Sequence, residues 1–208
     1  MPTLEYHGKP LFESNVINEF VEDVYGTDET YGRPLRPQDP YQRARGRIWT
    51  DFITSRIIPS FHRFLQFQPT GKSGDGSDGS EDEGLAAKRA EFLGYLKDFT
   101  REMDATGPYF FGSEPHLIDF AFAPWAVRLW VFDHFKGGLG IPEDGKGRAE
   151  DEQVWSRWRK WHSAIEGRET IKKTTSEKEH YLPIYQRYAD DKAQSELAKA
   201  TRKGTGVP

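Results

Sequence analysis

The segment from Phe120 to Phe135 is apolar on nearly every side of a helical projection. A helix of this kind is stable only when other elements surround it, so the chain must build a bundle around this segment. Arg128 stands out in it, because an Arg in such a run needs a paired position or a route to solvent. The sequence therefore predicts a mostly α fold with 120–135 as one buried central helix.

Apolar residues recur at helical spacing in three further segments, which predicts amphipathic helices there. The stripes are Ile17, Phe20, Val21 and Val24; Phe92, Leu93, Leu96 and Phe99; and Trp155, Trp158, Trp161 and Ile165. We expect the second of these helices over 85–103 and a last helix over 178–200. A Gly-rich, charged loop is expected over 136–151.

Asp39-Pro40 predicts a helix start, because Asp caps free N–H groups and Pro at the first position lacks one. We expect this helix to run from Tyr41 to Phe67. Pro59 lies inside it and should kink it, since Pro removes a hydrogen bond and clashes with the preceding turn.

Residues 69–84 form a low-complexity acidic stretch, predicted to be a flexible loop. A Ca²⁺ loop built on Asp75, Asp78 and Glu81 is the alternative, but the alternating ligand spacing of an EF-hand is missing. The five acids and one Lys of this stretch account for the whole net charge of -4. No basic excess remains, so we expect no nucleic-acid partner.

The first residues predict two short strands joined by a turn at Gly8, followed by a helix. Ser14 is the expected N-cap of that helix and Gly26 its stop. Residues 26–38 are rich in Gly, Pro and polar residues, which predicts a linker.

The chain has no Cys, which excludes disulfides, thiolate metal sites and a Cys nucleophile within these residues. Its six His show no metal-ligand spacing, so no metal site is expected. No apolar run has the length of a membrane span, and a membrane partner is not expected either.

Asp119 follows His116 by three residues at the head of the central helix. This spacing is that of a capping box, so we interpret Asp119 as a structural cap and not as a catalytic acid. An imidazole is a poorer cap than Ser or Thr, so a weakened box is expected.

Several motifs together resemble omega-class glutathione S-transferases. They are Pro2 with Glu13-Ser14, Asp39-Pro40-Tyr41 with Arg43-Ala44, Phe110-Phe111-Gly112, Ile118-Asp119, Pro124-Trp125 with Arg128-Leu129, and Trp161 with Thr175-Ser176-Glu177. The resemblance implies a partial thioredoxin-like domain over 1–36, comprising a β-hairpin and a helix, and an all-α C-terminal domain over 37–208. It also implies that the first half of the thioredoxin-like domain, which carries the family's catalytic residue, is absent.

The resemblance further implies glutathione as a co-substrate, with no metal. Met1, Pro2, Glu13 and Ser14 would bind glutathione, and Trp125, Arg128 and Trp161 would line the pocket for a hydrophobic or aromatic molecule. No catalytic residue is assigned, because omega enzymes use a Cys and the chain has none. A homodimer and a cytoplasmic location are also expected.

Three functions remain open at this point. The first is glutathione-dependent transfer, isomerisation or reduction on small electrophiles. The second is a non-catalytic protein-interaction module, and the third is a protein that binds aromatic metabolites. Simpler interpretations also stand for the site residues: Glu13 and Ser14 as a helix cap beside a solvated acid, and Trp125 and Trp161 as core packing.

Overall fold

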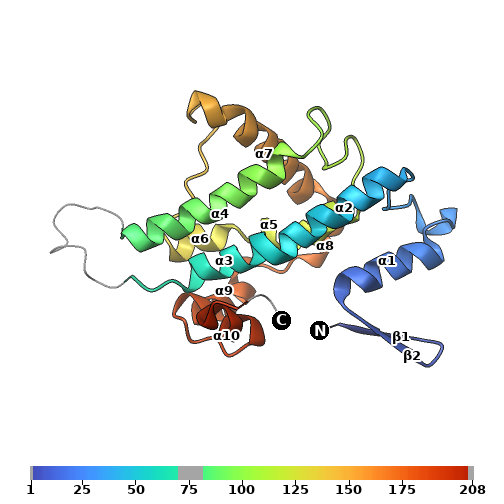
Figure 1. Cartoon of the computed structure of the whole chain (residues 1–208), viewed down its shortest axis with the longest axis horizontal. Helices are drawn as coiled ribbons and strands as arrows, with labels where there is room; N and C mark the ends of the chain where they lie inside the picture. The colour runs from blue at the N-terminus through green and yellow to red at the C-terminus, as the bar shows by residue number, and fades with distance from the viewer. Residues whose placement is uncertain (1, 70–81, 206–208) are drawn as a thin grey trace.

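The computed structural model describes residues 2–69 and 82–205 and has the expected mostly α architecture (Figure 1). A two-stranded hairpin and one helix precede a bundle of helices. The elements are β1 Thr3–Tyr6, β2 Lys9–Phe12, α1 Ser14–Tyr25, η1 Glu29–Tyr31, α2 Pro40–Phe52, η2 Ile53–Ile57, α3 Ile58–Gln66, α4 Glu83–Arg101, α5 Leu117–Ala126, α6 Trp130–Phe135, α7 Ala149–Gly167, α8 Glu169–Thr174, α9 Lys178–Ala189 and α10 Glu196–Lys203.

The hairpin confirms the prediction of two short strands. β1 and β2 are antiparallel, and Tyr6 pairs with Lys9 across a two-residue loop. Both loop residues, His7 and Gly8, have positive φ (50° and 74°). That conformation matches the twist of the flanking strands, and Gly adopts it without steric cost.

Helix α1 lies beside the bundle and buries none of its residues (Figure 1). It is held to α2 by the Arg47 guanidinium, which donates to both carboxylate oxygens of Glu19 at 2.8 and 2.7 Å. A second ion pair joins Asp23 of α1 to Arg36 in the connecting segment. Polar contacts at the surface are therefore part of this attachment.

Asp39 caps α2 as predicted, accepting from the backbone N–H groups of Tyr41 and Gln42. The predicted kink at Pro59 takes the form of a π-helical segment, η2, between α2 and α3. The N–H of Ile58 donates to the carbonyl of Ile53, five residues earlier. This wider turn precedes Pro59, which has no N–H to continue the α-helical ladder.

The prediction of one continuous central helix is wrong. α5 ends at Ala126, and α6 begins only at Trp130. In the turn between them, Arg128 donates its N–H to the carbonyl of Trp125, three residues earlier. Pro124 weakens the last turn of α5 because it cannot donate to the carbonyl of Phe120, and the turn carries Arg128 away from the helix axis.

The core is largely aromatic, and α5 lies near the middle of the bundle (Figure 1). Phe122 of α5 stacks on Trp161 of α7, with ring centroids 5.3 Å apart. Phe64 of α3 stacks on Phe132 of α6 at 4.5 Å. The α7 stripe predicted from Trp155 to Ile165 is buried as expected.

Other helices also differ from the sequence expectation. α4 begins at Glu83, inside the predicted acidic loop, because Asp82 caps it by accepting from the Leu85 N–H at 3.1 Å. The last predicted helix is divided into α9 and α10, and α8 was not anticipated. Residues 70–81, which include the alternative Ca²⁺ ligands Asp75, Asp78 and Glu81, lie outside the described residues.

Within the described part of the chain, no helix combines the length and apolar character needed to cross a bilayer.

Candidate functional site

The N-terminus of α1 carries the predicted glutathione-binding pair. Glu13 is the residue before the helix and has φ 72°, which is unusual for a residue other than Gly. Ser14 is the first helical residue and not the N-cap, so that prediction is wrong; within residues 2–69 and 82–205 no side chain caps this end. Glu13, Ser14 and Pro2 are exposed, and Met1 lies outside the described residues.

A helix end without a side-chain cap leaves its first N–H groups available to an anion. The strained backbone at Glu13 sets the direction of its carboxylate independently of the helix. Together these features could hold a group with one carboxylate and one ammonium.

Trp125 and Arg128 lie in a second group of side chains, built by α3, the end of α5 and α9. The centre of the Trp125 ring lies 5.3 Å from the centre of the Phe61 ring and 5.4 Å from that of His62. The Arg128 guanidinium carbon lies 4.7 Å from the centre of the Tyr181 ring, a cation–π contact. Arg128 Nε is buried and has no hydrogen-bond partner among the described residues.

Tyr181 has an unusual hydroxyl. The Ser176 N–H donates to it at 3.1 Å, and this bond, together with the nearby Arg128 guanidinium, lowers the pKa of the phenol. Burial has the opposite effect on its neighbour and raises the pKa of Tyr185. Sequence analysis missed both residues, although Tyr181, Tyr185 and Tyr188 recur at i, i+4 and i+7, a stripe that α9 presents on one side.

His62 of α3 also belongs to this group, and sequence analysis missed it. Its side chain is buried, and neither ring nitrogen has a hydrogen-bond partner in the described residues. Its ring lies 5.0 Å from Tyr188. Burial lowers the pKa of His62 to about 4, so the imidazole is neutral at pH 7.

Asp119 and Trp161 belong to the core. The fully buried Asp119 carboxylate accepts from the Phe110 N–H at 2.9 Å, the His116 N–H at 2.8 Å and Trp161 Nε1 at 2.7 Å. Burial raises the pKa of this carboxyl. The three hydrogen-bond donors act in the opposite direction, because they favour the charged form. The sequence resemblance places Trp161 in the lining of a pocket. In the structure this side chain is instead fully buried between Asp119 and Phe122.

The capping box at α5 is half formed. Asp119 accepts from the His116 N–H, whereas the His116 side chain makes no cap hydrogen bond. The Arg33 guanidinium instead approaches His116 Nε2 at 3.4 Å and pairs with Glu114 at 2.9 Å.

Metal ligands do not assemble in the part of the chain that the structure describes: no three His, Asp or Glu side chains there could hold one ion.

Comparison with known proteins gives one family. Residues 82–164 match the model of the glutathione S-transferase C-terminal domain. Glutathione S-transferase U27 of Arabidopsis thaliana is 30% identical over 129 residues, which is 60% of this chain and 50% of the relative. The probable glutathione S-transferase parC of Nicotiana tabacum is 30% identical over 146 residues, 69% of this chain and 58% of the relative. The chain thus spans about half the length of the curated relatives it matches.

Solved structures agree. Glutathione transferase Omega 3C from Trametes versicolor is 33% identical, with a TM-score of 0.70 and coverage of 93% of this chain and 71% of that one. A Tau class glutathione S-transferase from mango, Mangifera indica, has a TM-score of 0.69 at 20% identity and coverage of 91% and 76%. The second likeness concerns the fold alone.

Proposed function

This chain belongs to the glutathione S-transferase family, and on that premise we propose that it contributes two parts of a glutathione-dependent transfer site. The first part, at the N-terminus of α1, holds the γ-glutamyl group of glutathione. The second part, formed by Trp125, Arg128 and the tyrosines of α9, holds an electrophilic or aromatic co-substrate. Homodimer formation and a cytoplasmic location stay predictions.

The γ-glutamyl group carries one carboxylate and one ammonium. The free N–H groups at the start of α1 and the Ser14 hydroxyl suit the carboxylate. The exposed Glu13 carboxylate suits the ammonium. The uncapped start of α1 directly after a residue with φ 72° is the observation that carries this part of the proposal.

The co-substrate part combines aromatic surface with one fixed positive charge. The guanidinium of Arg128, seated on Tyr181, can attract an electron-rich or anionic substituent. The Tyr181 phenol, whose pKa is lowered, can donate a strong hydrogen bond to the same substituent. A small aromatic electrophile with an oxygen substituent fits this chemistry.

Omega type is the class we propose, supported by the 33% identity to the Trametes omega transferase. Omega chemistry passes through a Cys thiolate, and these 208 residues contain no Cys. A covalent thiol step therefore cannot run through this chain's own side chains. Its part in the reaction is to bind and orient the two substrates.

The experiment is a titration of residues 1–208 with γ-glutamylcysteine, followed by backbone amide shifts in ¹⁵N NMR spectra. We expect weak binding, with shifts concentrated on Ser14, Asn15 and Val16. Cysteinylglycine, which lacks the γ-glutamyl group, should leave these amides unmoved.

The matched controls use another Ser beside a Glu at a helix start. Ser14→Ala and Glu13→Gln should each weaken the shifts by about threefold or more, whereas Ser195→Ala at α10 should not. Equal responses to both dipeptides, or an unchanged response in both α1 variants, would refute the γ-glutamyl assignment.

A further inference from the structure

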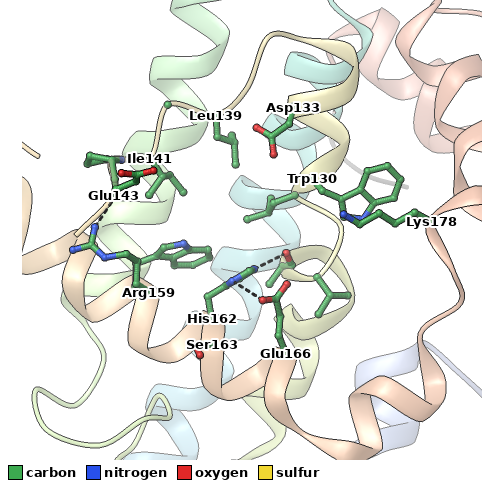
Figure 2. A pocket seen from close by; sticks show the side chains of 16 residues that line it. Trp130, Asp133, Leu139, Ile141, Glu143, Arg159, His162, Ser163, Glu166 and Lys178 are labelled. Carbon is green, nitrogen blue, oxygen red and sulfur yellow. Dashed lines mark hydrogen bonds and ion pairs between the residues drawn. The ribbon is translucent and has the colours of Figure 1, made fainter. Parts of the chain in front are cut away.

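A separate cavity of about 520 Å³ lies between α6, the segment after it, α7 and the start of α9. We name it the α6–α7 cavity; Figure 2 shows its side chains. None of Glu13, Ser14, Trp125, Arg128 or Trp161 lines it. The proposed transfer site therefore leaves this cavity without a role.

The walls of the cavity are apolar and partly aromatic. Trp158, Leu129 and Leu139 are buried residues of its lining, and Ile141 is partly buried. The Trp130 indole stands on the side nearest Lys178 (Figure 2). These walls suit a flat or aliphatic hydrocarbon body.

Carboxylates stand on opposite sides of this apolar space. Figure 2 shows Asp133 on one side and Glu166 on the other. In the described residues Asp133 has no cationic partner, and the partner of Glu166 is His162, whose Nδ1 lies 3.5 Å from it. Glu143, also at the cavity, pairs with Lys146 at 2.7 Å.

The cations at the cavity are already engaged. Arg159 pairs with Asp144 at 2.8 Å and with Glu152. The Lys178 ammonium lies over the Trp130 ring, 5.2 Å from its centre. The two acids that pair with Arg159 do not line the cavity. The charged side chains that line the cavity therefore carry a net negative charge.

His162 is fixed in orientation by contacts at both of its ring nitrogens. Its Nε2 lies 3.0 Å from the carbonyl oxygen of Ala126, which only accepts, so Nε2 carries a proton. The ring stacks on Trp158, with centroids 5.7 Å apart, and its other nitrogen faces the Glu166 carboxylate. The imidazole therefore forms part of the wall.

We propose that the α6–α7 cavity is a second ligand site that binds an organic amine with an apolar or aromatic body. The ammonium group is held by Asp133 or Glu166, and the body packs against Trp158, Trp130 and the aliphatic wall. An acidic ligand of the same shape is repelled by the carboxylates of Asp133 and Glu166. The site is independent of glutathione.

The test compares three probes of one shape by calorimetry at pH 7: 2-phenylethylamine, 2-phenylethanol and phenylacetate. We expect the amine to bind about tenfold more tightly than the alcohol, and phenylacetate to show no binding. Asp133→Asn and Glu166→Gln together should bring the amine to the affinity of the alcohol. Both residues are exposed, so these variants should fold, which circular dichroism checks.

Two further variants test whether charge at the cavity controls the affinity for the amine. Lys178→Gln removes the competing ammonium over Trp130 and should tighten amine binding about threefold. Glu169→Gln removes an exposed acid of α8 outside the cavity and should change nothing. Equal affinity for amine and alcohol, binding of phenylacetate, or no effect of the double variant would overturn the proposal.

Discussion

Asp119 joins three segments at a single buried carboxylate. It accepts one hydrogen bond from the turn at Phe110, one from the start of α5 at His116, and one from α7 at Trp161. A helix cap alone would explain one of these bonds. Because the other two connect distant parts of the chain, Asp119 stabilises the packing of the bundle as well as one helix end.

We predict that Asp119→Ala lowers the free energy of unfolding by about 3–5 kcal/mol, because three buried donors lose their acceptor. Urea denaturation measures this loss. Asp98→Ala serves as the control: its carboxylate forms an exposed pair with Arg101, so the change should stay within about 0.5 kcal/mol. A loss below about 1 kcal/mol for Asp119→Ala would contradict this role.

His62 should make the protein less stable in acid. Its pKa is about 4 in the folded protein, against about 6.5 when exposed. Between these values only the unfolded chain takes up the proton, so stability falls as pH drops from 6.5 to 4. The shift corresponds to about 3 kcal/mol.

His62→Leu should remove this loss and leave the protein at least as stable at pH 7, since two unpaired nitrogens disappear from the core. Urea denaturation at pH 7 and pH 4 gives the difference for both proteins. The same pH dependence in His62→Leu and wild type would show that His62 is not the group responsible.

Sequence reasoning worked best at residues whose roles are local. Asp39 caps α2 as its sequence context predicts, because a cap depends on its next three residues. The role of Trp161 depended on α5 packing against α7, which the α7 stripe alone does not specify. That stripe located a buried face without showing that the Trp161 indole N–H would meet Asp119.

At the scale of elements, Pro59 and Pro124 each lie near a break in a helix, but only the break at Pro59 could be predicted from the sequence. Pro59 interrupts an amphipathic helix, so the break was anticipated, and it is a π-helical segment. Pro124 lies in a run that is apolar on all sides, where periodicity cannot show that a helix ends. The break between α5 and α6 was therefore missed, and it is this turn that positions Arg128.

Removing the cap of α2 should destabilise that helix specifically. Asp39→Ala should cost about 1 kcal/mol, because the N–H groups of Tyr41 and Gln42 lose their acceptor. Thermal denaturation followed by circular dichroism measures the effect. Asp51→Ala, an exposed acid of the same helix, is the matched control and should have little effect; equal losses would contradict the assignment.

At the scale of the whole molecule, the hairpin and α1 differ from the helices that build the aromatic core. No residue of α1 is buried, whereas α3, α4 and α7 supply much of the aromatic core. Stability of a segment follows the apolar surface it buries. The division into residues 1–36 and 37–208 stays a prediction.

We predict that amides of α1 exchange with deuterium far faster than those of α4 and α7. Ion pairs at the surface, such as Arg47 with Glu19, contribute only about 1 kcal/mol or less, so local opening of α1 is easy. Hydrogen exchange measured by mass spectrometry tests this. Protection of α1 equal to that of α4 would mean that both parts unfold as one unit.

The central claim is that the start of α1 and the group around Arg128 are two parts of one site. Calorimetry of residues 1–208 with glutathione and with S-benzylglutathione tests it most directly. We predict weak binding of glutathione and about tenfold tighter binding of the conjugate, because burying its ring adds about 1.5 kcal/mol or more. Ser14→Ala and Arg128→Met should each reduce the affinity for the conjugate. Equal affinity for both ligands, or conjugate binding that ignores Ser14, would contradict the account.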